Sequence, residues 1–339
     1  MLQFVAASPA HNNNIPGTRM KLTTLIIIAC LLQLTGCASL GIGNRPMAEL
    51  TEKYTDHHSK FIAVDDLIVH YRDQGDGPVL LLLHGVASSL HTWDAWAERL
   101  QDRYRVIRLD LPAHGLTGPD PKRKRYDIDY MVSVLDTFVR ELQLPPFVLA
   151  GNSLGGYISW NYALHHPQNV EKLILIDAAG YPQKMPFIMS MAAWPVMGEM
   201  STLMMPRFIV GSNIRAAYGD SSKVDKALVR RYHDLTLREG NRRGLMNVFR
   251  TMKEQSRIAT LGDRVQEVNT PTLLMWGEED TWVPLTILER FRQDLPNVQV
   301  ITYEGVGHMP MEEIPNQTAR DAHAFIEGSY TPAAMSQVE

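Results

Sequence analysis

The sequence has little cysteine, little excess charge and no long apolar run. Two cysteines among 339 residues rule out a framework of several disulfides. The net charge of −4 is too small for the basic footprint of a nucleic-acid-binding protein, so nucleic acid is not expected as a partner. Because 45% of the residues are hydrophobic and 21% are charged, the chain suits one large α/β domain with an insertion, or two smaller domains.

Residues 1–36 have the features of a targeting segment. Arg19 and Lys21 precede the uncharged run 22–34, which is too short for an ordinary membrane span and ends in small residues. Met20 is a more natural start than Met1, because residues 1–19 are polar and without pattern. The segment therefore predicts export from the cytoplasm.

The run Leu34-Thr35-Gly36-Cys37 resembles the lipobox of bacterial lipoproteins, which are cut before the cysteine and acylated on its thiol. A plain secretory signal or an uncleaved anchor remains the alternative. The resemblance implies that Cys30 leaves with the signal, that lipid consumes Cys37, and that the mature protein keeps no thiol. Lipidated Cys37 would hold the protein on a membrane, and Ala38 after it favours the outer membrane of the bacterial cell envelope. A polar linker is expected over residues 37–60.

Strand-like and helix-like segments alternate after the linker, which predicts a mostly parallel sheet covered by helices on both faces. The helix-like segments include 128–142, the segment after Gly155, and 284–295. Residues 67–71 read as an edge strand, and 79–83 is uninterrupted aliphatic sequence, as expected for a strand buried on both faces. The remaining strands are expected at 106–109, 147–150, 173–176, 272–276 and 298–303.

Residues 181–268 break this alternation, since they contain helix-like pieces but no convincing buried strand. The simplest interpretation is a helical cap inserted between two core segments, 61–180 and 269–328, with 329–339 as a C-terminal tail. The first part of the cap is rich in methionine, either as ordinary core or as a deformable wall for an apolar substrate. The methionines are Met185, Met189, Met191, Met197, Met200, Met204 and Met205. Arg242 and Arg243 are expected on a solvated face.

The run Gly151-Asn152-Ser153-Leu154-Gly155 matches G-x-S-x-G, a sharp turn from a strand into a helix with a serine at its apex. Gly151 and Gly155 provide the space for a tight turn and for close packing of strand and helix. Ser153 would be presented as a nucleophile at the N-terminus of the helix. The Leu154 N–H can face a developing oxyanion there.

A serine needs a base and an acid that orients the base. His308 follows the last strand and Asp280 follows the strand before it, both at the carboxyl ends where open α/β sheets place their sites. The acid has three rivals, namely Glu278, Glu279 and Asp177. Asp280 is preferred from its spacing to Pro284.

The stretch His84-Gly85-Val86 follows the strand 79–83, where a second oxyanion donor is expected, and the Val86 N–H is the candidate. His114 is expected to shape a loop, and the pair His165-His166 to mark a helix end. No metal or organic cofactor is required by these groups.

The conjunction of the serine motif with His84-Gly85, Asp110-x-Pro112-x-x-Gly115, Asp280 and His308 resembles the α/β-hydrolase family over about residues 60–328. With the lipobox, Ile176-Asp177-Ala178-Ala179-Gly180 and the cap, the chain looks most like capped bacterial lipase and esterase lipoproteins of the lipase family V kind. The resemblance implies hydrolysis of carboxylic esters with hydrophobic acyl groups.

Other functions remain open. Hydrolases of C–C bonds share much of the pattern, as do acyltransferases, and a lipid-anchored binding protein could keep the fold without turnover. Haloalkane dehalogenases and epoxide hydrolases use an aspartate nucleophile, so Ser153 argues against both. The reaction class follows from the triad, whereas the substrate does not.

Overall fold

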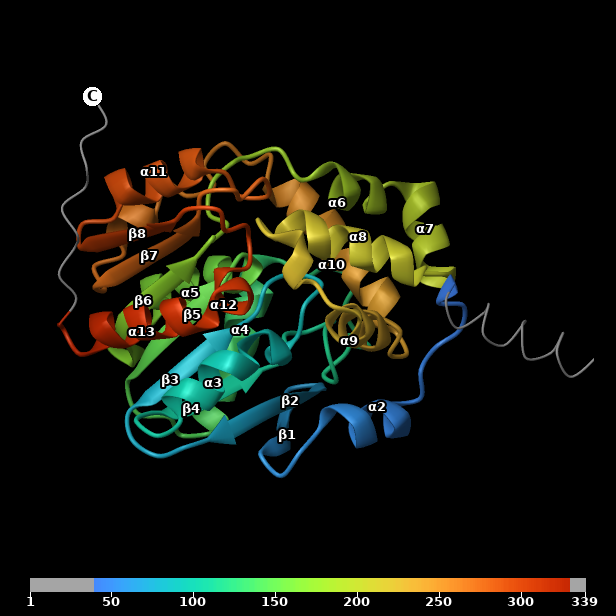
Figure 1. The fold of residues 1–339 in the computed structure, drawn as a ribbon, viewed down its shortest axis with the longest axis horizontal. Helices are drawn as coiled ribbons and strands as arrows, with labels where there is room; N and C mark the ends of the chain where they lie inside the picture. The colour runs from blue at the N-terminus through green and yellow to red at the C-terminus, as the bar shows by residue number, and fades with distance from the viewer. Residues whose placement is uncertain (1–39, 330–339) are drawn as a thin grey trace, which may run out of the picture. The chain divides into compact units, whose positions relative to one another are not determined.

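The computed structural model describes residues 40–329 (Figure 1). Their core is an eight-stranded sheet in the order β1-β2-β4-β3-β5-β6-β7-β8. Strands β1 and β2 pair antiparallel, as do β2 and β4, and all other neighbours are parallel. The strands are β1 (Ser59–Val64), β2 (Leu67–Gln74), β3 (Val79–Leu83), β4 (Arg105–Leu109), β5 (Phe147–Asn152), β6 (Val170–Ile176), β7 (Thr272–Gly277) and β8 (Val298–Tyr303).

Helices cover both faces of the sheet, which explains the aliphatic strands. Every residue of β3 is buried, with Leu81 and Leu83 in one apolar cluster and Leu80 and Leu82 in the other, as the two-residue repeat of a strand requires. The first cluster includes helices α4 (Ile128–Glu141), α5 (Leu154–His165) and α11 (Leu285–Asp294). The second includes α3 (Asp94–Leu100) and α13 (Pro315–Ile326). The sheet is therefore the central layer of three.

The seven strands expected from the sequence are confirmed, but the edge assignment is wrong. Strand β2 is not at the edge, because β1 pairs along its outer side, from Ser59 opposite Arg72 to Val64 opposite Leu67. Five of the six β1 residues are not fully buried, and the strand does not have the uninterrupted aliphatic sequence from which the inner strands are predicted.

The expectation of a plain linker over residues 37–60 is also wrong for its described part. Helix α2 (Met47–Tyr54) lies there, and its Leu50 and Tyr54 side chains pack with Leu116 and Leu235. The Tyr54 hydroxyl donates to Asp234 Oδ2 at 2.8 Å. This segment is thus built onto the folded body, whereas Cys37 and residues 1–36 lie outside the described residues.

Five α-helices separate β6 from β7, and they form the cap (Figure 1). They are α6 (Phe187–Ala192), α7 (Pro195–Leu203), α8 (Arg207–Ala217), α9 (Lys226–Thr236) and α10 (Asn241–Gln255). Arg242 of α10 is buried and not solvated, contrary to expectation, because its guanidinium donates to the Gly41 and Gly43 carbonyls at 2.7 Å each. Within residues 40–329, no helix has the length and apolar character needed to cross a membrane.

Candidate active site

Ser153 occupies the turn between β5 and α5, with φ +54° and ψ −113°. A non-glycine residue in such a conformation costs about 1–3 kcal/mol, which the surroundings must offset. Two backbone hydrogen bonds hold it: the Ser153 N–H donates to the Ile176 carbonyl at 3.0 Å, and the Ser153 carbonyl accepts from the Ala179 N–H at 3.2 Å. The turn therefore fixes the serine at the carboxyl end of β5, against the end of β6.

Gly151 and Gly155 are required by close packing around this turn. A Cβ at Gly155 would lie 2.2 Å from the Leu83 carbonyl oxygen, and one at Gly151 would lie 2.3 Å from the Gly155 carbonyl oxygen. Neither backbone oxygen can move aside without disturbing a buried strand or helix. The space that the sequence motif predicts is thus used to bring α5 against β3.

His308 and Asp280 form a buried pair. Asp280 Oδ2 lies 2.7 Å from His308 Nδ1, and Asp280 Oδ1 accepts from the Trp282 and Val283 N–H groups at 2.7 and 3.0 Å. Burial alone would raise the pKa of Asp280, but the charge and hydrogen bond of His308 hold it below its ordinary value. Asp280 is thus an ionised acceptor that fixes the Nδ1–H tautomer of His308.

Asp177, the first residue after β6, lies beside this pair. One side-chain ligand atom from each of Asp177, Asp280 and His308 falls within 4.8 Å of the others. Asp177 is fully buried, and its Oδ1 accepts from the Gly277 N–H at 3.1 Å. Burial and the adjacent Asp280 carboxylate raise the pKa of Asp177 well above its ordinary value. Of the two neighbouring carboxyl groups, Asp177 is therefore the one that holds a proton, and Asp280 is the one that is ionised.

Within residues 40–329, neither Glu278 nor Glu279 is hydrogen-bonded to His308. The Glu278 carboxylate accepts from the Thr302 hydroxyl at 2.7 Å on the surface, and Glu279 is exposed. Among the acids weighed from the sequence, Asp280 is the one that the structure bonds to the histidine. Because both Asp280 oxygens and His308 Nδ1 are engaged, the cluster with Asp177 has little free capacity for a metal ion.

Ser153 and His308 meet in one cavity of about 310 Å³, which they line together. No hydrogen bond joins the Ser153 hydroxyl to His308 in the part of the chain that the structure describes. Such contacts commonly tighten when substrate binds. The sequence prediction that these residues converge thus has its geometric counterpart in the shared cavity.

The loop after β3 runs directly past the serine. A Cβ at Gly85 would lie 3.2 Å from Ser153 Cβ, and the next residue, Val86, lines the cavity. Leu154 is the first residue of α5, where backbone N–H groups have no partner within the helix. The N–H groups of Val86 and Leu154 therefore flank the serine as candidate oxyanion donors.

Two buried histidines shape this loop. His84 Nε2 accepts from the Leu111 N–H at 3.0 Å while its Nδ1 donates to the Gly85 carbonyl at 2.7 Å. His114 Nε2 accepts from the Ala87 N–H at 3.0 Å, and burial lowers the pKa of His114 to about 3. Burial also lowers the pKa of His84. Both imidazoles are neutral and connect neighbouring loops by hydrogen bonds, which matches the loop-shaping role expected for His114.

The cavity wall is almost entirely apolar, with methionine as its commonest residue. Five of the cap methionines noted in the sequence line it, together with two others. Flexible thioethers fill irregular space and adapt to different apolar shapes. The wall therefore suits a hydrophobic group placed next to Ser153. The seven are Met189, Met197, Met200, Met204, Met205, Met246 and Met309.

Glu313 fastens the His308 loop to the cap. Its carboxylate accepts from the Gly219 and Asp220 N–H groups after α8, at 3.1 and 2.7 Å, and from the Gly307 N–H at 3.0 Å. The His308 N–H itself donates to the Ala217 carbonyl at 2.6 Å. We refer to these contacts as the cap clamp, and through them the end of α8 positions His308.

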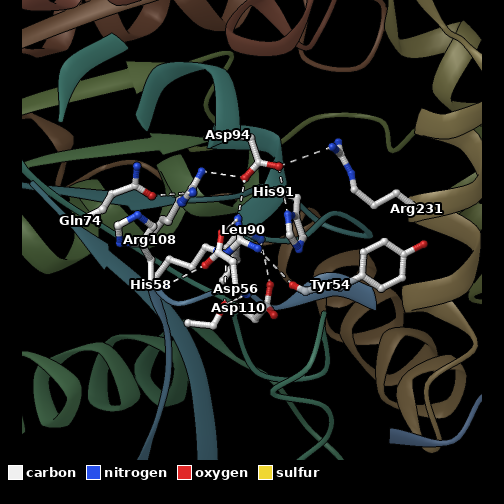
Figure 2. A network of polar contacts seen from close by, with 12 residues as sticks. Tyr54, Asp56, His58, Gln74, Leu90, His91, Asp94, Arg108, Asp110 and Arg231 are labelled. Atoms are coloured by element: carbon white, nitrogen blue, oxygen red, sulfur yellow. Dashed lines mark hydrogen bonds and ion pairs between the residues drawn. The ribbon is translucent and has the colours of Figure 1, made fainter. Parts of the chain in front are cut away.

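A second polar network joins the cap to the other side of the core (Figure 2). Asp94 at the start of α3 binds Arg108 of β4 at 2.8 Å and lies 3.9 Å from Arg231 of α9. Arg231 also pairs with Glu312, which accepts from the Tyr232 hydroxyl at 2.8 Å. The α8–α9 part of the cap is thus tied to the core at two places.

Sequence reasoning missed several of these supports. The Asn152 amide donates to the Ile176 and His308 carbonyls at 3.2 and 3.1 Å, and so joins the ends of β5 and β6 to the His308 loop. Asn152 is a variable position of the G-x-S-x-G motif, so the motif predicts no role for its side chain. Glu313 has no signal of its own in the sequence, because its partners after α8 are about ninety residues away.

Comparison with known proteins agrees with this fold. A family model described as alpha/beta hydrolase fold matches residues 78–315, and the chain belongs to this family. The chain has the hydrolase fold, with Ser153 in a sharp strand-to-helix turn, a hydrogen-bonded Asp280–His308 pair and a helical cap.

Among individual proteins, it is 28% identical over 265 residues to pimeloyl-[acyl-carrier protein] methyl ester esterase of Nitrosomonas europaea, covering 74% of this chain and 96% of that one. It is 26% identical over 285 residues to Lipase 3 of a Moraxella species, covering 78% and 82%. The crystal structure of a membrane phospholipase A, a bacterial virulence factor, superimposes with a TM-score of 0.69 at 26% identity, covering 91% and 99%.

Proposed function

We propose that this hydrolase is a serine carboxylic-ester hydrolase for esters of hydrophobic acyl groups. The observation that carries the proposal is the strained Ser153 turn, which shares an apolar cavity with the Asp280–His308 pair. A relative that is an ester esterase and another that is a lipase support the same reaction class. No cofactor is needed for this chemistry.

The mechanism follows from the positions of the groups. His308 Nε2 takes the Ser153 proton as Oγ attacks the acyl carbon, and Asp280 stabilises the imidazolium through Nδ1. The Val86 and Leu154 N–H groups stabilise the oxyanion, each contributing on the order of 10²–10³ in rate. His308 then gives the proton to the leaving alcohol oxygen, and water releases the acyl group from Ser153 by the same route.

Hydrolysis of p-nitrophenyl esters over a series from short to long acyl chains tests the proposal. Ser153→Ala should lower kcat by roughly 10⁵-fold or more while the protein stays folded. Ser133→Ala, at an exposed serine of α4, is the matched control and should keep full activity. Serine-dependent turnover with a long-chain optimum would support the proposal. A folded wild-type protein inactive on the whole series would refute it and favour C–C hydrolysis, acyl transfer or binding.

We further propose that Cys37 carries lipid and holds the enzyme in the bacterial cell envelope, at the outer membrane. The lipobox resemblance and Ala38 support this assignment. Mass spectrometry of the mature N-terminus should find an acylated cysteine at position 37, and Cys37→Ala should abolish that mass. A mature protein that begins elsewhere would overturn the anchor without affecting the ester hydrolase proposal.

A further inference from the structure

The cap presents an unusual number of large apolar side chains to solvent. Seven of the fourteen exposed ones in residues 40–329 come from residues 187–208. Single exposed apolar residues are ordinary, whereas a concentration of them marks an interaction surface. Six of these side chains, between 49% and 74% exposed, are named the apolar cap face: Phe187, Trp194, Val196, Met200, Leu203 and Phe208.

Helix α7 carries the centre of this face. Val196, Met200 and Leu203 stand at positions i, i+4 and i+7, so they share one side of the helix, and that side is exposed. A surface helix of a water-soluble protein normally turns its polar side outward. Trp194, at the N-terminus of α7, is of the residue type that is enriched where protein meets lipid headgroups.

The start of the described chain lies against the same helix. Ile42 forms a β-bridge with Met204, and the Gly41 carbonyl accepts from the Met205 N–H at 3.2 Å and from the Arg242 guanidinium at 2.7 Å. Leu40 and Ile42 are themselves exposed apolar side chains. Residues 40–44 are therefore fixed to the cap beside the end of α7.

This attachment places the start of the described chain, three residues after the proposed anchor, beside the apolar cap face. Three residues of extended chain span at most about 11 Å, so Cys37 cannot be farther than that from Leu40. Acyl chains on Cys37 would enter the bilayer next to α7. A bilayer is the occupant that both the exposed side chains and the tether predict.

The apolar cap face and the cavity lie on opposite sides of the same cap segment. Met197 and Met200 line the cavity and are also exposed, and Met204 and Met205, next to the N-terminal attachment, line it too. An acyl chain that leaves the bilayer at α7 would reach Ser153 along thioether side chains. It would not have to cross bulk water.

We infer that the apolar cap face lies on the membrane surface beside Cys37, and that the cavity receives long-chain ester lipids from that membrane. The tether part rests on the proposed lipidation, and the substrate part rests on the proposed ester hydrolysis. Docking itself can be measured without turnover.

Membrane docking can be measured with site-specific labels, because the chain has only two cysteines, Cys30 and Cys37. Leu203→Cys and Ile68→Cys are made in the full chain, which is purified from membranes and reconstituted in vesicles of phosphatidylethanolamine and phosphatidylglycerol. Each thiol is labelled with an environment-sensitive fluorophore. Ile68, on β2 and also exposed, is the matched control. Iodide is the quencher in water, and a nitroxide-bearing phospholipid is the quencher in the membrane.

We expect the label at residue 203 to be quenched by the lipid nitroxide and protected from iodide, with the reverse at residue 68. Equal access of iodide to both labels would overturn the docking. Protection of the label from iodide without nitroxide quenching, together with a disulfide-linked dimer of the unlabelled Leu203→Cys variant, would assign the face to a second copy and also overturn the docking. Labelling of the chain without an added cysteine would show a free thiol at Cys30 or Cys37, which a cleaved and acylated lipoprotein does not have, and so tests the anchor separately.

A second variant links docking to substrate delivery. Val196→Ser, Leu203→Ser and Phe208→Ser, combined, change side chains outside the cavity lining. Hydrolysis of a vesicle-embedded long-chain ester should fall roughly tenfold or more, because the apolar area that enters lipid is lost. Hydrolysis of a soluble short-chain ester should not change. Equal effects on both substrates would contradict a docking role, and no activity on either by wild type would instead refute the ester hydrolase proposal.

Discussion

Replacing Asp177 by asparagine should make the protein more stable, and the gain should grow with pH. The folded protein keeps Asp177 protonated because it is fully buried beside the Asp280 carboxylate, whereas the unfolded chain ionises it at its ordinary pKa near 4. Above that pH, the folded state holds one more proton than the unfolded state. Raising the pH therefore favours unfolding of the wild type, by up to about 1.4 kcal/mol per pH unit until Asp177 ionises in the folded protein.

Asparagine has the same shape and cannot ionise, so Asp177→Asn removes this slope. Its amide can still donate to Asp280, and we expect ester hydrolysis to stay within about threefold of wild type. The difference in unfolding free energy between variant and wild type should rise from pH 5 to pH 6, by at most about 1.4 kcal/mol. Urea unfolding followed by tryptophan fluorescence, with refolding checked at each pH, gives this difference.

Asp234 provides a control of opposite sign. It is equally buried, but Lys53, Tyr54 and Arg45 surround it, and although burial alone would raise the pKa of Asp234, these partners hold it below its ordinary value. Its contribution to stability is complete above the unfolded pKa and is lost only as the pH falls through the folded pKa. Asp234→Asn should thus be destabilised by the same amount at pH 5 and pH 6. A difference for Asp177→Asn that is also independent of pH would show that Asp177 is ionised in the folded protein, and would refute the reasoning.

Three further predictions test the turn, the clamp and the cavity. Gly155→Ala should lower the unfolding free energy by about 1–3 kcal/mol, because its Cβ would lie 2.2 Å from a strand carbonyl; an unchanged Tm would contradict the packing argument. Glu313→Ala leaves three backbone N–H groups without their acceptor, so kcat should fall more than KM changes, and an effect confined to KM would argue against positioning of His308. Met246→Trp should shift the optimum of the p-nitrophenyl series to shorter acyl chains by filling the cavity, whereas Met252→Trp, outside the lining, should not. Equal optima for the two variants would place the acyl chain elsewhere.

The parts of the fold that the sequence predicts are those in which local pattern and tertiary role coincide. Strand β3 is aliphatic because both its faces are covered, and G-x-S-x-G is a local requirement of the turn that carries Ser153. Strand β1 and helix α2 lack such a pattern, since each buries few side chains. Their order depends on distant partners, as when Tyr54 meets Asp234.

The candidate site divides in the same way. Ser153, Asp280 and His308 follow strand ends, and strand order alone brings them to one edge. Asp177 also follows a strand, so its nearness to Asp280 could be expected, but its protonation depends on complete burial, which no local sequence pattern reports. The residues that hold the His308 loop, Asn152 and Glu313, depend on contacts between segments far apart in the chain.

The cap clamp also bears on how this enzyme could change its substrate during evolution or by design. Segments inserted between β6 and β7 look like exchangeable modules, because the sheet does not need them to form its hydrogen bonds. In this protein the cap is not separable at β6 and β7 alone, because Glu313 lies in the core sequence but is hydrogen-bonded to the residues after α8. A chimera that exchanged residues 181–268 alone would lose the contacts that the residues at the end of α8 make with the His308 loop and Glu313. A chimera that also carried residues 305–313 from the donor of the cap would keep these contacts.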